Sequence, residues 1–272
     1  MTLTELIATV PAKYLPFHSG KYSVSPGLKS IETDFGNGSA DHHIFQIDRD
    51  YLRFVQNKQA CRRENIAKYY QRKRESSGTL QVINQFIAKQ LAAEYPNYFA
   101  YQYSNEISQL NNYLRDKTVR WNTDQKLLEE SEYQSVFDAL ADQIPEDLAI
   151  WQCSDQDDYI STIHLCAPNH WLPAEKIGKP FSMIHGPVAG MDKLRKNYRP
   201  MLSSLLQPKT WVRFAWGLST DDWLNHHPEP PPQHSKEDWQ GRSFNPTNSK
   251  LFVRVERQTL TGFPEVNAIL FT

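Results

Sequence analysis

The sequence predicts an α+β fold with its helices first and most of its strands second. Apolar residues recur at helical spacing in the part of the chain that precedes Pro145. After Pro145 they alternate with polar residues or form short runs bounded by turn residues, which is typical of strands. This change of period separates a mainly helical region from a region built on a sheet.

Three helices are expected before Pro145. The first fifty residues are rich in glycine and proline, and we expect them to wrap a core that later segments build. The second predicted helix carries Ile83, Ile87 and Leu91 on one side, and Pro96 ends it. The predicted helices cover residues 51–70, 80–95 and 131–144.

The second region is expected to contain five strands and a helical insertion. Strand patterns occupy residues 148–153 and 159–167, helical or irregular segments fill 173–206, and strand patterns return at 209–218, 251–260 and 268–272. This order predicts a PAS-like antiparallel sheet: two strands, a helical insertion and three strands, with a helical N-terminal extension packed on it. The expected boundaries are 1–145 for the extension and 146–272 for the PAS-like region, within one continuous structural unit.

A long loop is expected at residues 225–249. A loop of that length in a compact domain is usually functional or disordered, and a lid and a disordered segment both remain open. It contains the pair His226 and His227, but adjacent side chains point in different directions and no third ligand stands at suitable spacing. A metal site is therefore not favoured there.

The composition indicates a globular protein and excludes nucleic acid as a partner. The chain has 272 residues, of which 39% are hydrophobic and 22% charged, and its formal net charge is −1. Binding a nucleic-acid backbone needs clustered basic residues, whereas the one basic cluster here has helical spacing and acidic neighbours. We expect a solvated helix face, formed by Arg62, Arg63, Lys68, Arg72, Lys73 and Arg74.

Cysteine usage and hydropathy favour a reducing compartment, so the cytoplasm is the expected location. Cys61, Cys153 and Cys166 make an odd count without a CxxC pair, which excludes a disulfide framework or an iron–sulfur cluster within this chain. No apolar run reaches the roughly 20 residues that span a bilayer, so no membrane partner is expected. The first eleven residues lack the basic residues of a signal peptide.

His185 is the first candidate site residue. It precedes Gly186 and Pro187, which should end the helix before them. A histidine at a helix end either bonds to nearby backbone or presents a neutral imidazole to a metal. A thiolate ligand at Cys166 is the alternative, but a buried free cysteine is favoured because no basic residue beside it would lower its pKa.

Arg213 and Glu256 are the other two candidates. Alternation places Arg213 on one strand face with Trp211, where it stacks on an aromatic ring or reaches solvent at the sheet edge. Glu256 and Arg254 share one face of the predicted strand 251–260, and the opposite face is apolar. A structural ion pair between the two side chains is one explanation for this placement of charges. No glycine-rich phosphate fingerprint opens a helix, so binding of a nicotinamide dinucleotide or FMN has no support.

Several stretches together resemble a known family. The most specific are residues 182–188, around His185, and residues 254–260, around Glu256; residues 16–28, 91–96, 146–148, 167–171 and 175–178 follow in the same order. These sequence stretches resemble the haem-binding subunit of the haem-dependent oxidative N-demethylases. The resemblance implies haem b on a PAS-like domain, His185 as the axial ligand of the haem iron, and Arg213 and Glu256 as polar lining of the distal pocket.

The resemblance also implies an activity. The expected reaction is oxidative N-demethylation of a small alkylamine with dioxygen, releasing formaldehyde, with Glu256 facing the cationic amine. Electrons are expected from NADPH through FMN and an iron–sulfur cluster on separate reductase polypeptides. The chain ends at Thr272, whereas the family is expected to continue past the final strand with a further acidic residue. A haem-binding sensor or carrier without oxygenase activity is therefore the alternative, and a haem-free protein of the same fold is a third.

Overall fold

The computed structural model describes residues 14, 27–35, 40–154, 156–185, 198–240, 244–247 and 250–272. Its strands are β1 (Lys29–Ser30), β2 (Tyr70–Arg72), β3 (Phe99–Ser104), β4 (Ile107–Asn112), β5 (Lys117–Asn122), β6 (Leu148–Cys153), β7 (Asp158–His164), β8 (Thr210–Ser219), β9 (Phe252–Phe263) and β10 (Ala268–Phe271). Its helices are α2 (Tyr51–Tyr69), α3 (Ser77–Glu94), α4 (Val136–Ala141), α5 (Pro173–Lys176), α6 (Phe181–Ile184), α8 (Arg199–Leu205), α9 (Lys236–Gln240) and the 3-10 turn η1 (Pro264–Val266).

The strands form two antiparallel sheets. The larger has seven strands in the order β1-β8-β9-β10-β6-β7-β2, and the smaller has the order β3-β4-β5. The expected mixture of helices with an antiparallel sheet is confirmed, and so are the five strands after Pro145, with shifts of up to three residues at their ends. The three predicted helices correspond to α2, α3 and a shorter α4. The residues 16–20 that carry part of the resemblance lie outside the described chain.

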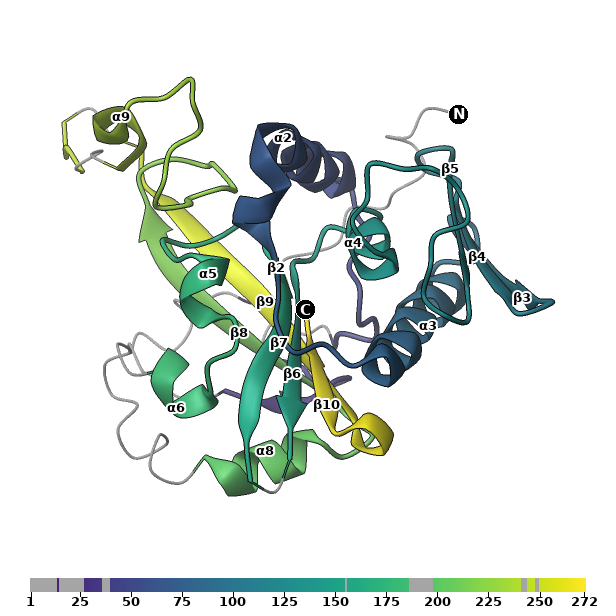
Figure 1. Ribbon diagram of the computed structural model, residues 1–272. Coiled ribbons are helices and arrows are strands. Elements are labelled where there is room, and N and C mark those ends of the chain that lie inside the picture. Colours follow the sequence, from purple (N-terminus) through teal and green to yellow (C-terminus); the bar gives the residue numbers. More distant parts are fainter. Residues whose placement is uncertain are drawn as a thin grey trace.

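One face of the large sheet carries the main apolar core. Buried side chains of β6 and β10, among them Ile150 and Leu270, pack with Ile83 and Leu91 of α3. Figure 1 shows α2, α3, α4 and the smaller sheet gathered on this side. These packed elements come mostly from the first half of the chain.

The opposite face carries two smaller apolar clusters. Ile269 of β10 and Leu260 of β9 pack with Phe181 of α6 and with the buried leucines of α8. Ile163 of β7 packs in a second cluster with side chains from the segment around α5 and α6. Because side chains alternate along a strand, this face is also the one on which Arg213 and Glu256 lie.

Sequence reasoning missed the smaller sheet and both edge strands of the larger one. The hairpin between β3 and β4 turns at Asn105 and Glu106, whose φ angles of 51° and 63° match the paired positive values of a type I′ turn. Asn105, at the first turn position, is a residue typical of this turn and could have indicated the hairpin. Glu106, at the second position, is unusual there and obscures the pattern. The edge strands β1 and β2 contain two and three residues, too few for alternation to reveal them.

The expected solvated basic face is wrong in part. Arg62 points inward, where its side chain is 7% exposed and pairs with Asp138, whose side chain is fully buried. Lys68 pairs with Glu64 four residues earlier, and both side chains are mostly covered. Residue 72 ends β2 instead of continuing the helix. A buried acidic partner on α4, which the local pattern does not reveal, draws Arg62 into the interior.

Candidate functional site

His185 follows α6 directly and is held in one orientation. Its Nδ1 hydrogen is donated to the carbonyl oxygen of Phe181 at 3.1 Å, because a carbonyl can only accept. Its ring stacks on Phe181 with centroids 4.0 Å apart and lies nearly parallel to Trp151 at 6.3 Å. Burial lowers the pKa of His185, and the charges of Lys176 and Arg213 lower it further. The imidazole is therefore neutral, with a lone pair on Nε2. The following residues, 186–188, lie outside the described chain.

Arg213 lies on β8 with its guanidinium incompletely bonded. Its Nε is buried and has no hydrogen-bond partner among the described residues, and the same holds for Nε1 of Trp211 two residues earlier. Burial lowers the pKa of Arg213, and the negative charge of Glu256 opposes that effect. Two buried donors on one strand face thus lack acceptors, which is costly unless another group supplies them.

Glu256 lies on β9 beside Arg254. Arg254 Nε donates to Glu256 Oε1 at 3.0 Å, so the ion pair considered from the sequence is present. The other guanidinium nitrogens of Arg254 donate to the carbonyl oxygens of Ala167 at 2.7 Å and Leu224 at 3.0 Å. Arg254 therefore links the loops that contain Ala167 and Leu224 to β9. Among the described residues, Oε2 of Glu256 has one long contact, 3.5 Å from Nε2 of Gln258.

Lys176, at the end of α5, is a site residue that sequence reasoning missed. Its Nζ lies 3.5 Å from the ring centroid of Trp171, a cation–π arrangement. Burial lowers the pKa of Lys176 to about 8, and the charges of Glu175 and Glu256 oppose the shift. The stretch around it carried part of the resemblance, but nothing in the local pattern showed that this lysine faces the sheet.

The structure brings the three predicted residues and Lys176 to one side of the large sheet. Arg213 pairs in register with Gln258 and Ala215 with Glu256, which makes Arg213 and Glu256 diagonal neighbours on adjacent strands. His185 approaches the same face from α6, and its pKa responds to both Arg213 and Lys176. The arrangement combines a neutral imidazole, two cationic groups and one carboxylate next to aromatic rings.

Two cavities lie away from His185. One of about 300 Å³ is lined by Gly217, Arg254, His170 and His226, and it lies beyond Ala215 and Glu256 along the same strand face. The other, of about 350 Å³, is lined by the aromatic side chains Trp223, His234 and Trp239 together with residues of α2. Neither lining includes His185, Arg213 or Glu256.

The competing candidates have other partners. His226 Nε2 pairs with Asp221 at 2.9 Å, whereas Nδ1 of His227 accepts from the backbone of Glu229 at 3.1 Å. The two rings therefore bond to different partners. Cys166 is fully buried and its pKa is raised by burial, as expected for a free cysteine. The expectation that no basic residue adjoins it is wrong, because Nδ1 of His164 lies 3.9 Å from its sulfur.

Comparison with known families gives a match over most of the chain. The model of the family described as haem-dependent oxidative N-demethylase, alpha subunit-like, matches residues 37–272. No protein of established function matched in the comparison with curated proteins. The matched range includes His185, Arg213, Lys176 and Glu256. The chain belongs to the haem-dependent oxidative N-demethylase alpha subunit-like family.

Proposed function

We propose that this chain binds haem b through His185 and catalyses the oxidative N-demethylation of a small alkylamine. The observation that carries the proposal is the tautomer of His185. Its Nδ1 hydrogen is donated to the carbonyl oxygen of Phe181, which leaves the lone pair of Nε2 available as a ligand. Histidine ligands to metals usually have such a second partner, which fixes the ring and its tautomer. The family supports haem as the metal group.

The surrounding residues fit a haem with acidic substituents. Nε of Arg213 and Nε1 of Trp211 are buried donors without partners among the described residues, and an anionic or oxygen-rich group would supply acceptors. Trp151 and Phe181 add apolar, aromatic surface around the imidazole. Haem, when bound, supplies the activation of dioxygen and the oxidation of the substrate's methyl carbon.

Glu256 is the proposed anchor for the amine. An alkylamine is a cation near neutral pH, so an otherwise apolar site needs a carboxylate to bind it. Arg254 holds Oε1 of Glu256, whereas Oε2 has one long contact among the described residues, so Oε2 is the atom that accepts the ammonium hydrogen. Lys176, whose pKa burial lowers to about 8, becomes neutral in mildly alkaline solution and then repels a cationic substrate less.

The strand order supports a PAS-like assignment. Numbered along the chain, the five strands β6, β7, β8, β9 and β10 lie side by side in the order two, one, five, four, three. We propose residues 146–272 as the PAS-like haem-binding region and 1–145 as the extension that covers its other face. The strands β1 and β2 of the extension pair with β8 and β7, so the two regions form one structural unit.

We further propose that the electrons come from partner polypeptides. The family is named after an alpha subunit, which supports an assembly with separate reductase components. NADPH, FMN and an iron–sulfur cluster are assigned to those partners, because this sequence carries no motif for them. No helix among the described residues is long and apolar enough to span a membrane. A cytoplasmic setting is proposed from the three unpaired cysteines.

A formaldehyde assay tests this function. Haem-loaded protein is given a surrogate electron donor, dioxygen and, in turn, mono-, di- and trimethylamine. The proposal predicts formaldehyde in equal amount to the demethylated amine, with one substrate preferred. Protein that binds haem but releases no formaldehyde from any of these amines would contradict the oxygenase assignment and favour a haem sensor or carrier.

A further inference from the structure

A second cluster of potential ligands lies on the opposite side of the large sheet from His185. Asp147, His164 and Cys166 each offer one ligand atom, and these atoms all lie within 4.8 Å of one another. His164 and Cys166 are 1% and 0% exposed, and Asp147 is half-buried. We propose that these three side chains form a binding site for a thiophilic divalent cation, with Zn²⁺ as the preferred ion. The proposal is independent of the haem.

The geometry of His164 and Cys166 suits a shared ion. The distance from His164 Nδ1 to Cys166 Sγ is 3.9 Å. Bond lengths of about 2.0 Å to nitrogen and about 2.3 Å to sulfur, at a tetrahedral angle, place the two atoms about 3.6 Å apart. A movement of a few tenths of an ångström therefore brings the pair to coordination distance. A nitrogen and a sulfur ligand together select zinc over magnesium or calcium.

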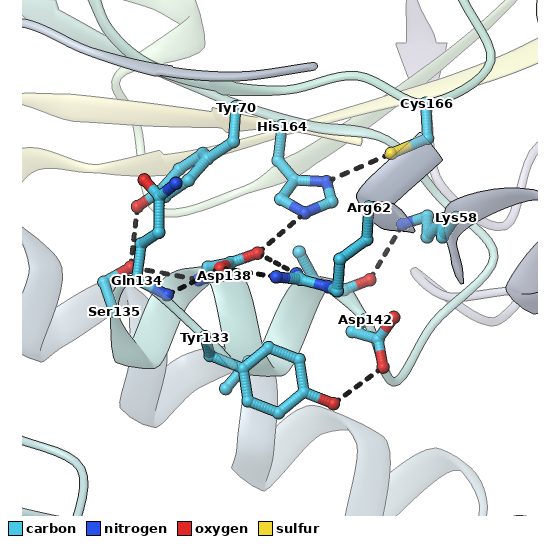
Figure 2. A network of polar contacts seen from close by, with 12 residues as sticks. Lys58, Arg62, Tyr70, Tyr133, Gln134, Ser135, Asp138, Asp142, His164 and Cys166 are labelled. Carbon is cyan, nitrogen blue, oxygen red and sulfur yellow. Dashed lines mark hydrogen bonds and ion pairs between the residues drawn. The ribbon is translucent and has the colours of Figure 1, made fainter. Parts of the chain in front are cut away.

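The other nitrogen of His164 has the partner that metal-bound histidines usually have. Nε2 lies 3.1 Å from Oδ1 of Asp138, a fully buried carboxylate of α4 (Figure 2). Such a carboxylate fixes the ring and makes the metal-facing nitrogen a better ligand. Figure 2 shows His164 between Asp138 and Cys166, so that Nδ1 faces the sulfur. The arrangement places Nδ1, the proposed ligand atom, on the side of Cys166.

Asp147 supplies a negative charge that no cation balances within the described chain. Its two oxygens accept from the backbone amides of Cys166 and Ala167 at 2.7 and 2.8 Å, and it forms no ion pair with any described residue. Each carboxylate oxygen keeps a second lone pair for an ion. The same bonds hold the carboxylate against Cys166. Because Asp147 is only half-buried, it also provides a route of entry for the ion.

The neighbouring cations already have acceptors of their own. Arg62 is paired with Asp138, and Nζ of Lys58 donates to the backbone carbonyl oxygens of Ala141 and Glu146. The charge of Lys58 nevertheless reaches His164, whose pKa it lowers against the larger raising effects of Cys166 and Asp138. Nδ1 of His164 must therefore exchange its proton for the ion before it can act as a ligand.

Two protons leave when the ion binds. Without metal, the pKa of His164 is raised to about 9, so Nδ1 carries a hydrogen, and burial raises the pKa of the Cys166 thiol. Coordination needs the neutral imidazole and the thiolate, so Nδ1 releases one proton and Sγ releases another. Because both ligands must lose protons, the apparent affinity for Zn²⁺ should increase with pH.

The experiment uses the full chain, stripped with a chelator and titrated with Zn²⁺ alone. We expect one ion per chain and an X-ray absorption spectrum at the zinc edge with one sulfur at about 2.3 Å and nitrogen or oxygen at about 2.0 Å. Cys166→Ser should lose the sulfur shell and weaken binding at least tenfold. Cys153→Ser is the matched control, because Cys153 is also buried, at 3% exposure, but packs in the cluster with Phe181.

Two results would overturn the site. One is a wild-type chain that retains no zinc under these conditions, which would leave Asp147, His164 and Cys166 as a metal-free polar network. The other is a zinc spectrum without sulfur, or with a sulfur shell that persists in Cys166→Ser. The wild-type spectrum alone is decisive if Cys166→Ser does not fold.

Discussion

The Nδ1 hydrogen of His185 is donated to the carbonyl oxygen of Phe181, four residues earlier, across 3.1 Å. The ring of the same Phe181 stacks on the imidazole with centroids 4.0 Å apart. Phe181 thus fixes both the tautomer and the plane of the imidazole, and no acidic side chain of the described residues bonds to it. A neutral imidazole held in this way is prepared to act as a ligand, which is the basis of the proposed haem site.

Glu256→Gln should impair substrate binding while leaving haem binding intact. The substitution removes the negative charge that balances the alkylammonium, so we expect the KM for the amine to rise about tenfold, or about 1.4 kcal/mol. The Soret band should not change, since His185 is not touched. Glu265→Gln is the control, because Glu265 is exposed on η1. Equal KM values for the two variants would remove Glu256 from the substrate site.

Asp138→Asn should strongly destabilise the fold. Asp138 pairs with Arg62 and His164, and the side chains of these partners are 7% and 1% exposed. Removing one member of a buried ion pair leaves uncompensated charge and costs about 3–5 kcal/mol. Asp157→Asn breaks an exposed pair with Arg74 and should cost less than about 1 kcal/mol. Denaturant unfolding of both variants measures the difference, and similar small losses would show that the buried network contributes little.

The stability of metal-free protein should fall with pH because of His164. Its pKa is raised from 6.5 to about 9, mainly by Cys166 and Asp138 acting against burial. The folded state therefore binds more protons than the unfolded state in this window, so the stabilisation is complete below pH 6.5 and is lost as the pH rises to about 9. Unfolding measured in chelator on both sides of the window tests this. The decline should shrink in His164→Gln and persist in the control His42→Gln, since His42 is exposed.

Gly262→Ala should destabilise the protein, whereas Gly217→Ala should not. A Cβ at Gly262 of β9 would lie 2.3 Å from the carbonyl oxygens of Leu205 and Gln207, which belong to the backbone at the end of α8. A Cβ at Gly217 of β8 would meet nothing within 4 Å. Overpacking of this kind costs about 1–3 kcal/mol. Midpoints of thermal unfolding measure both variants, and an unchanged midpoint for Gly262→Ala would show that α8 shifts freely.

Much of the large sheet could be predicted because its strands carry simple patterns. In β9, Arg254 and Glu256 are two residues apart, so they had to share a face, and the structure pairs them at 3.0 Å. The strands β3 to β5 were not predicted because residues 99–122 contain many polar residues, such as Asn and Gln, that are not typical of strands. The edge strands β1 and β2 depend on partners in β8 and β7, which a local pattern cannot reveal.

The site was harder to predict than the fold. Lys176 and His185 come from the short segments around α5 and α6. The approach of Lys176 to Glu256 and of His185 to Arg213 depends on how these segments pack on the sheet. His164 and Cys166 share a strand region, so their proximity could have been read from spacing. The inward turn of Arg62 and the approach of Asp138 could not, because α2 and α4 meet there only through tertiary packing.

The most direct test of the central claim is the absorption spectrum of the purified protein, expressed with added haem precursor. Wild type is compared with His185→Ala and with His42→Ala, a control at an exposed histidine. We predict a Soret band in wild type and His42→Ala, and its loss or shift in His185→Ala. A wild-type protein without a Soret band, or a band that His185→Ala leaves unchanged, would contradict the assignment of His185 as the haem ligand.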